Sequence, residues 1–295
     1  MKRTAVSVRL GGVLAACAGL AVAAHAAPAD DFESALTFYR QARYGEARRI
    51  FARLAAERPE DPALDFYLGR LALWFDDGAE ALTRLERAAR REPASARVQN
   101  ALGDAYGLAA QQAGLLAKFS WAMKCKAAYE RAVELEPGNC NYHWSLLGYD
   151  LVAPRIAGGG VDLARGQAAE IEKLDPMNGR IALATIALGE KKFAAAFAEF
   201  DDVLRRSPDD FMALYQVGRC AALSGQQLDR GIAALRRCLD LPAPEGEGKP
   251  GAADIHYRLA ELLEKKGDAA GARAEYARAA RENPDFRPAK VALRN

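Results

Sequence analysis

Apolar residues recur three and four positions apart along most of the chain, in short blocks separated by turns. Leu64, Leu68 and Leu71, for example, fall on one helical face, and a turn that contains Gly78 follows them. This spacing is typical of amphipathic α-helices, and glycine and proline mark the places where such helices stop. The pattern therefore predicts an all-α chain of short paired helices.

The prolines that end these helix pairs recur with a period. They fall at Pro59, Pro93, Pro137, Pro176, Pro208, Pro242 and Pro284, with spacings of 34, 44, 39, 32, 34 and 42 residues. In the first two units the register is strict, because Ala47 and Ala81 are 34 residues apart, as are Phe51 and Leu85. A 34-residue period of two helices predicts a solenoid, whose units bury their apolar faces by stacking on their neighbours.

The residues within the period resemble the tetratricopeptide repeat. One unit reads Leu68-Gly69, Ala81, Leu85, Ala88 and Pro93. The same order recurs as Leu102-Gly103, Tyr106, Tyr129, Ala132 and Pro137, and as Leu259-Ala260, Ala272, Tyr276, Ala279 and Pro284. The resemblance covers about residues 28–284 and implies a superhelical solenoid of about seven helical hairpins. We expect the repeats at about 28–61, 62–95, 96–139, 140–178, 179–210, 211–244 and 253–286, and a short, frayed capping helix at 285–295.

The first 26 residues have the composition of a secretory signal peptide. Lys2, Arg3 and Arg9 are basic, residues 10–24 are apolar, and Ala24-His25-Ala26 is a small-residue cleavage pattern. We expect cleavage after Ala26 and a periplasmic or secreted protein. Leu14-Ala15-Ala16-Cys17 also resembles a lipobox, which would anchor the protein through Cys17. We favour soluble export, because the apolar run continues past Cys17 to the cleavage pattern.

Removal of these residues changes the charge of the chain. It leaves 38 Lys and Arg residues against 39 Asp and Glu residues, so the net charge is near −1. No basic field remains that would favour a nucleic-acid partner. No later apolar run is long enough to predict a transmembrane segment.

Four cysteines remain, and their helical spacing argues against disulfides. Cys125 and Cys140 would lie roughly 17 Å apart along the helical rise. Cys220 and Cys238 fall on antiparallel helices at levels roughly 7 Å apart. A disulfide needs Cα atoms closer than these pairs allow, so we expect buried thiols.

Two units are longer than the period. About ten extra residues in 107–120 are expected to lengthen both helices of the third unit, and about four extra residues fall in 153–160 of the fourth. Insertions in successive repeats lie on one edge of a solenoid, so we expect the two to meet. The residues expected in this contact are Leu115, Leu116, Phe119 and Trp121, covered partly by Pro154 and Ile156. The second insertion resembles that of exported bacterial tetratricopeptide proteins without a settled activity. A further loop, residues 242–252, is expected to set the last unit slightly apart.

The sequence offers little that predicts catalysis, a metal site or a cofactor. Gly158-Gly159-Gly160 could offer backbone amides to a phosphate, but no strand precedes it and no Lys-Ser/Thr follows it. We therefore interpret it as a flexible turn. His143 and His256 lie 113 positions apart without other ligands at metal-binding spacing, and neither completes a catalytic triad.

In the tetratricopeptide family the first helix of each unit lines the concave surface. The resemblance thus predicts groove residues on the face of these helices that the core does not use. They are Tyr67, Arg70, Trp74, Asn100, Asp104, Tyr142, Tyr149, Tyr215, Arg219 and Tyr257. Tyr, Trp and Arg are common anchors of protein interfaces, although aromatic residues at helical spacing also build cores.

We hypothesise that the protein is an exported scaffold, not an enzyme, that binds a protein or peptide in this groove, with a cell-envelope assembly as one setting for it. One alternative is a small-ligand or enzymatic role at the glycine-rich insertion. Another is a structural protein anchored by lipid at Cys17.

Overall fold

Helical hairpins follow one another throughout the structure. The computed structural model describes residues 28–242, 244 and 250–294, so the predicted signal peptide and Cys17 lie outside the described residues. The described part contains fifteen α-helices, one 3₁₀ helix and no β-strand. The seven hairpins are α1 (Pro28–Arg40) with α2 (Tyr44–Glu57), α3 (Pro62–Trp74) with α4 (Gly78–Arg91), α5 (Ala96–Gln112) with α6 (Leu115–Leu135), α7 (Cys140–Val152) with α8 (Val161–Leu174), α9 (Pro176–Gly189) with α10 (Phe193–Arg206), α11 (Phe211–Ser224) with α12 (Leu228–Asp240), and α13 (Ala252–Lys265) with α14 (Ala269–Glu282). The helix α15 (Arg287–Ala292) follows, and η1 (Arg155–Ala157) joins α7 to α8. The all-α prediction and the number of repeats are confirmed.

Aspartates begin many of the helices. The side chain of Asp61 accepts a hydrogen bond from the Ala63 amide, and Asp77 and Asp210 cap α4 and α11 in the same way. These bonds satisfy amides that the first helical turn leaves without a partner. Asp175 caps α9, whose first residue is Pro176. Pro176 thus opens a helix as well as following one, because the first helical position needs no amide hydrogen.

Glycines let the two helices of a hairpin approach closely. A Cβ atom on Gly69, Gly103 or Gly218 would lie 2.4–2.5 Å from the side chains of Leu85, Tyr129 or Leu235. Any larger residue would collide with the partner helix. This contact explains why Leu-Gly pairs recur with the period.

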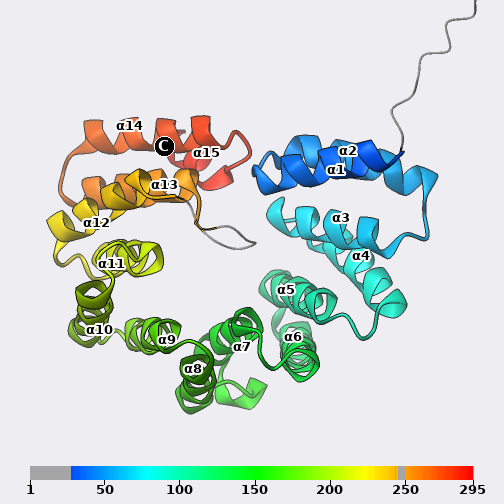
Figure 1. Ribbon diagram of the computed structural model, residues 1–295, viewed down its shortest axis with the longest axis horizontal. Coiled ribbons are helices and arrows are strands. Elements are labelled where there is room, and N and C mark those ends of the chain that lie inside the picture. The colour runs from blue at the N-terminus through cyan, green and yellow to red at the C-terminus, as the bar shows by residue number, and fades with distance from the viewer. Residues whose placement is uncertain (1–27, 243, 245–249, 295) are drawn as a thin grey trace, which may run out of the picture.

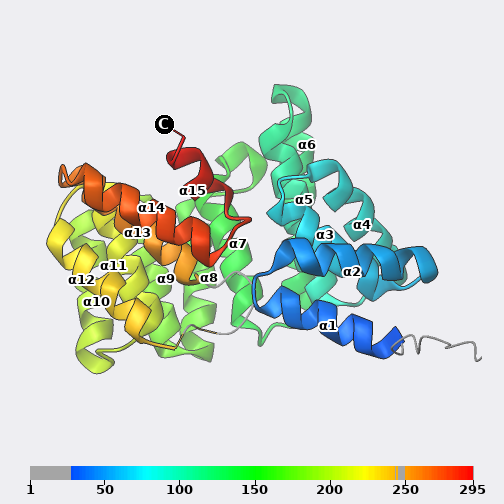
Figure 2. The same ribbon diagram turned by 90° about the horizontal axis from the view of Figure 1, so that it is seen from above.

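The lengthened third unit has the predicted form. The extra residues extend α5 to 17 residues and α6 to 21, whereas the preceding α3 and α4 have 13 and 14. In Figure 2 the end of this hairpin projects beyond the neighbouring helices.

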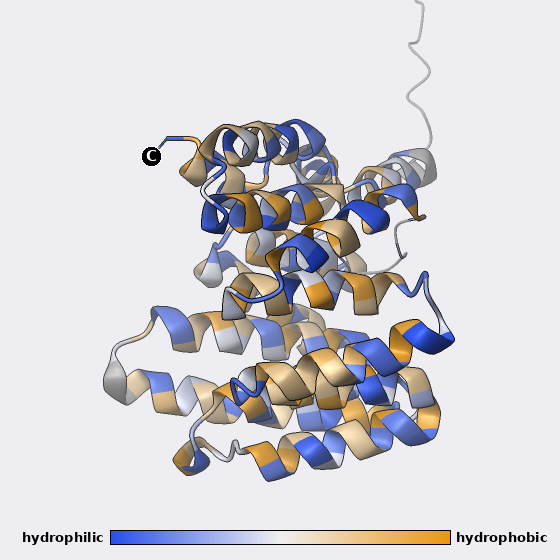
Figure 3. Ribbon diagram, turned by 90° about the vertical axis from the view of Figure 1, so that its left-hand side faces the viewer, coloured by the Kyte–Doolittle hydropathy of each residue, from blue (hydrophilic) through white to orange (hydrophobic). Residues whose placement is uncertain are grey.

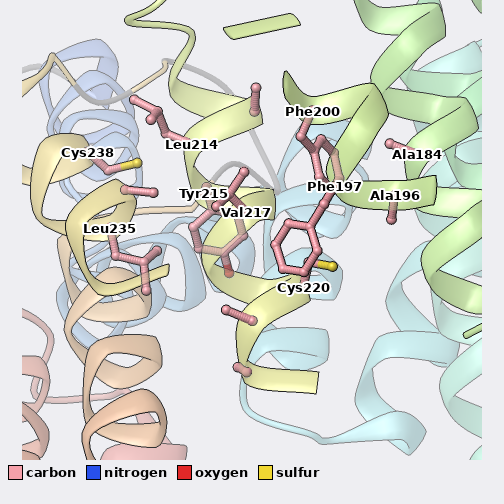
Figure 4. Close-up of a cluster of buried hydrophobic side chains, with 14 of the residues drawn as sticks. Ala184, Ala196, Phe197, Phe200, Leu214, Tyr215, Val217, Cys220, Leu235 and Cys238 are labelled. Atoms are coloured by element: carbon pink, nitrogen blue, oxygen red, sulfur yellow. The ribbon is translucent and has the colours of Figure 1, made fainter. Parts of the chain in front are cut away.

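The largest core cluster spans three successive repeats, from Ile181 of α9 to Leu262 of α13. In the largest cluster, Phe197 and Phe200 of α10 pack with Val217 and Leu235 of the next hairpin (Figure 4). Ile255, Leu259 and Leu262 of α13 belong to the same cluster. The prediction that the 242–252 loop sets the last unit apart is therefore wrong, because α13 packs directly on α11 and α12.

The superhelix closes on itself. Figure 1 shows a ring in which α5, α7, α9, α11 and α13 lie inside and their partner helices outside, with the first hairpins next to α13, α14 and α15. The Asp285 carboxylate accepts a 3.0 Å hydrogen bond from the Gly45 amide, and Arg287 donates to the Phe75 carbonyl oxygen at 3.3 Å. We call this contact between residues 44–76 and 285–292 the seam. The tail expected to be frayed is thus packed, with Ala289 fully buried.

Within the described residues, no helix has both the length and the apolar character needed to cross a bilayer. Hydrophilic and hydrophobic residues alternate along the helices visible in Figure 3, as expected of amphipathic helices that pack on one face.

Candidate functional site

A pocket of about 300 Å³ lies between the inner helices α11 and α13. We call it the inner pocket; it is lined by Arg219, Ala222, Leu223, Arg258, Glu261, Glu264 and Lys265. Leu223 is 60% exposed. The pocket therefore combines an exposed apolar side chain with charged groups of both signs.

Two arginines dominate the charge of the inner pocket. Arg258 bonds to Glu261 at 2.7 Å, and against the effect of burial this pairing raises the pKa of Arg258. Arg219 donates to the neutral Gln216 Oε1 at 3.0 Å. Burial lowers the pKa of Arg219, and the charge of Arg258 lowers it further. The Arg219 guanidinium is thus a half-buried cation without a directly bonded carboxylate among the described residues, a group that favours a carboxylate-bearing partner.

A second cavity, of about 640 Å³, lies at the seam. It is lined by Asp76, Tyr257, Glu264, Tyr276, Arg287, Pro288, Val291 and Ala292. Glu264 lines both cavities and accepts a hydrogen bond from the Tyr276 hydroxyl at 3.0 Å. The inner pocket therefore borders the seam.

Three predicted groove residues belong to the helix packing instead. Tyr67 stacks on the Phe51 ring with centroids 5.0 Å apart, and Tyr142 and Tyr215 are each only 8% exposed. Their rings serve the core, so their prediction as exposed anchors is wrong. The face of each first helix that borders the groove also packs on the adjacent repeat, so that repeat covers the aromatic rings on it.

Other predicted groove residues lie in polar contacts within or between repeats. Arg70 bonds to Asp104 at 2.6 Å, and Asp104 also accepts from the Tyr129 hydroxyl at 2.7 Å. The Tyr149 hydroxyl donates to the Ala157 carbonyl oxygen at 2.6 Å. The half-buried Asn100 has no hydrogen bond at Oδ1 within the described residues. Arg70 is thus already paired across two repeats, whereas Asp104 with Tyr129 and Tyr149 with Ala157 hold single repeats together.

Trp74 and Tyr257 lie at the seam. Trp74 packs against Tyr44 and Phe286, with ring centroids 4.6 and 6.3 Å apart. Tyr257 contacts Phe286 with centroids 5.7 Å apart. Of the ten predicted groove residues, Arg219 is the one that lines the inner pocket.

The two insertions meet, but not through the expected apolar contact. Lys126 Nζ donates to the Gly158 carbonyl oxygen at 2.8 Å. Trp121 stacks on Tyr106 of α5, whereas Ile156 is 80% exposed and Pro154 is exposed as well. The predicted cover by Pro154 and Ile156 is therefore wrong, since a polar bond from Lys126 of the lengthened helix α6 reaches the backbone of the second insertion. Phe119 is 44% exposed, and the side chains of Leu115 and Leu116 lie outside the described structure.

The glycine-rich turn has no amide to offer a phosphate. The Gly158, Gly159 and Gly160 amides donate to the carbonyl oxygens of Arg155, Pro154 and Asp150. Gly158 and Gly160 have φ values of +79° and +152°, which only glycine adopts readily. The turn is thus a structural link between α7 and α8.

Both described histidines are engaged in hydrogen bonds. His143 is buried, with Nε2 2.9 Å from the Pro137 carbonyl oxygen and Nδ1 2.8 Å from Gln167 Oε1. His256 Nδ1 lies 2.7 Å from Glu275. The part of the chain that the structure describes contains no group of three or more His, Cys, Asp and Glu residues arranged to hold a metal ion.

Sequence reasoning missed several residues of these sites. Arg258 and Leu223 line the inner pocket, and Arg258, Glu261 and Lys265 follow a helical spacing that marks one face. That spacing could have indicated the pocket. Phe286 and Arg287 of the seam have no such signal, because closure depends on the curvature of the whole array.

The chain belongs to the tetratricopeptide repeat family. Tetratricopeptide repeat models match residues 38–105, 181–243 and 220–285, which together cover more than half of the chain. No curated protein sequence matches it significantly.

Solved tetratricopeptide structures share the fold. A thermophilic tetratricopeptide protein of Thermus thermophilus is 20% identical, with a TM-score of 0.54 over 72% of this chain and 100% of its own. A tetratricopeptide repeat protein of Parabacteroides merdae is 11% identical, with a TM-score of 0.55 over 90% and 97%. Yeast Tom70 is 14% identical, with a TM-score of 0.60 over 91% of this chain and 56% of Tom70. At these identities the similarity establishes the fold.

Proposed function

We propose that the protein is an exported scaffold that binds a protein or peptide segment on the inner face of its ring. The inner pocket carries this proposal. Leu223 offers exposed apolar area there, and Arg219 offers a half-buried charge. Arginine is a typical anchor of protein interfaces, and the exposed Leu223 beside it would lose apolar surface to water on binding.

The form of the repeat supports binding of an extended segment. Seven stacked hairpins present successive first helices on one continuous inner surface (Figure 1), the surface that solenoids offer to partners. The proposal assigns binding to this surface and no catalytic step.

Photocrosslinking in the native cell envelope tests the inner pocket. A photoreactive amino acid at position 223 should capture a discrete partner. The same group at Leu174, which is 44% exposed at the end of the outer helix α8, serves as the matched control. Arg219→Gln should reduce capture at position 223. Equal capture at both positions, or capture that Arg219→Gln leaves unchanged, would refute the assignment.

The export proposal rests on residues 1–26 of the sequence and has its own test. The protein recovered from its native host should have the mass of a chain that begins at Ala27, and Cys17→Ala should leave that mass unchanged. A chain that keeps residues 1–26 would contradict export by cleavage. A diacylglycerol-modified Cys17 would instead establish the lipid anchor.

A further inference from the structure

Exposed apolar side chains concentrate on the two insertions and on the residues that flank them. We call residues 107–126 and 152–163 the insertion lobe. Of the eight large apolar side chains that are exposed in the described part of the chain, five lie there. They are Phe119, Met123, Val152, Ile156 and Leu163. Single exposed apolar residues are ordinary on protein surfaces, but such a concentration marks an interaction surface.

These side chains share one rim of the ring. Phe119 and Met123 are four residues apart on α6, so they lie on one helical face. Lys126 continues that face and reaches the Gly158 carbonyl oxygen beside η1, the helix that carries Ile156. The end of α6 projects beyond the body of the ring (Figure 2). The insertion lobe is therefore a protrusion with apolar side chains from both insertions.

The charge of the insertion lobe is positive. No acidic residue occurs between Asp104 and Glu130, whereas Lys118, Lys124 and Lys126 fall in that interval. Arg155 adds a fourth cation, with its side chain 87% exposed and 3.6 Å from Asp162, the single acid of the lobe. The mature chain as a whole is close to neutral, so this local excess of cations favours an anionic partner.

The shape of the insertion lobe favours a lipid surface over a folded protein. Val152 and Ile156 are 86% and 80% exposed and project from a helix end and a tight turn. Neither cavity described above includes a residue of the lobe. Anchors of protein interfaces sit in well-packed pockets, but a bilayer needs no complementary shape. Apolar side chains enter the boundary of the acyl chains while flanking lysines reach the phosphates.

We propose that the insertion lobe docks the protein peripherally on an anionic lipid bilayer. Phe119, Met123, Val152, Ile156 and Leu163 enter the interface, and Lys118, Lys124 and Arg155 contact lipid phosphates. No segment crosses the bilayer in this arrangement. The inner face of the ring stays clear of the lipid, so docking and partner binding are independent.

Vesicle flotation tests the proposal with the chain that begins at Ala27, which keeps every described helix. The chain should float with vesicles of equimolar phosphatidylcholine and phosphatidylglycerol, and only weakly with phosphatidylcholine alone. Phe119→Ser combined with Ile156→Ser should lower partitioning at least about tenfold, because each exchange removes the burial of a large apolar side chain. Leu174→Ser combined with Val291→Ser is the matched control, since these residues are 44% and 56% exposed outside the lobe.

Charge reversal tests the electrostatic part. Lys118→Glu combined with Arg155→Glu should abolish the preference for anionic vesicles. Lys173→Glu combined with Arg205→Glu, on α8 and α10 with 69% and 70% exposed side chains, should leave it intact. Unchanged melting curves verify that the variants fold.

Three results would overturn the proposal. They are no flotation with anionic vesicles, an equal loss of flotation in the lobe and control variants, or equal flotation with anionic and neutral vesicles. If the chain does not float with vesicles and the lobe variants lose a crosslink to a protein, the lobe is a protein-docking surface instead.

Discussion

The carboxylate of Asp285 accepts a 3.0 Å hydrogen bond from the backbone amide of Gly45, 240 positions earlier in the chain. Phe286 next to it is 6% exposed and contacts the rings of Trp74 and Tyr257. Arg287 reaches the Phe75 carbonyl oxygen and lies 3.5 Å from Asp76. The terminal repeats of most solenoids contact a neighbour on one side only, but here the seam gives each end a second contact.

Phe286→Ala should open the ring. Removal of a buried phenylalanine costs about 3 kcal/mol or more, and the contact with Trp74 and Tyr257 would be lost. We expect a larger radius of gyration in small-angle scattering with unchanged helix content. With Trp121 and Trp144 replaced by Phe, the emission of Trp74 should become more accessible to a quencher.

Val291→Ser on the same helix is the control for this experiment, because Val291 is 56% exposed and borders the seam cavity. An equal change in both variants would show that α15 responds to any substitution. An unchanged scattering curve for Phe286→Ala would show that the seam does not hold the ring closed.

Gly103→Ala should destabilise the third repeat. A Cβ atom there would lie 2.5 Å from the Tyr129 ring, and forced overpacking typically costs about 1–3 kcal/mol. Gly148 offers a matched control, because it lies within α7 and a Cβ would meet nothing within 4 Å. Gly148→Ala should stabilise by up to about 1 kcal/mol through helix propensity. Urea denaturation of both variants measures the difference, and destabilisation by both would contradict the packing argument.

Asp150 should make the stability of the protein depend on pH. The side chain is 2% exposed, and its Oδ1 has no hydrogen-bond partner among the described residues. Burial raises the pKa of Asp150 to about 6, against the opposing effect of Lys126. Between about pH 4 and pH 6 the folded state keeps a proton that the unfolded state has lost. Stability therefore falls as pH rises through this window, and above it the folded protein carries a buried charge.

The isosteric variant Asp150→Asn removes this titration. We expect it to exceed the native chain in free energy of unfolding at pH 7.5, by on the order of 1 kcal/mol. The difference should vanish below about pH 4, where the carboxyl is protonated in both states. Urea denaturation across this range measures the effect, and a difference that is constant with pH would disprove it.

The sequence predicts the hairpins well because their determinants are local. The register of Ala47 with Ala81 and the recurring Leu-Gly pairs reflect contacts within one or two repeats. The extra residues at 107–120 lengthen two helices because nothing in them stops a helix before Ala113. Pro176 does not fix the repeat boundary in the sequence, because proline is compatible with the end of one helix and with the first turn of the next.

The inner face was harder to predict. The helical spacing of Tyr67, Tyr142 and Tyr215 places them off the core-facing side of their own hairpin. It does not show whether the next repeat covers them, as the structure finds. Arg70 and Asp104 fall on the same face and pair with one another across repeats. The seam depends on small rotations that accumulate over seven repeats, and these rotations leave no local pattern.

Buried thiols offer a measure of local opening in the ring. Burial raises the pKa of Cys125 and Cys238 to about 12 and that of Cys220 to about 11. Because the thiolate is the reactive form, these three should resist maleimide at pH 7.5 until their repeat opens. Cys125 reports on the third repeat, and Cys238 reports on the sixth, next to the last hairpin.

Phe286→Ala should therefore accelerate labelling of Cys238 more than that of Cys125. Each repeat is stabilised by its neighbours, so loss of the seam loosens the repeats nearest to it first. Peptide mapping by mass spectrometry separates the cysteines, and Val291→Ser again serves as the control. Equal acceleration at both sites would mean that the ring unfolds as one unit. In that case the seam would stabilise all repeats alike, and no state would exist in which the seam is broken while the middle repeats stay folded.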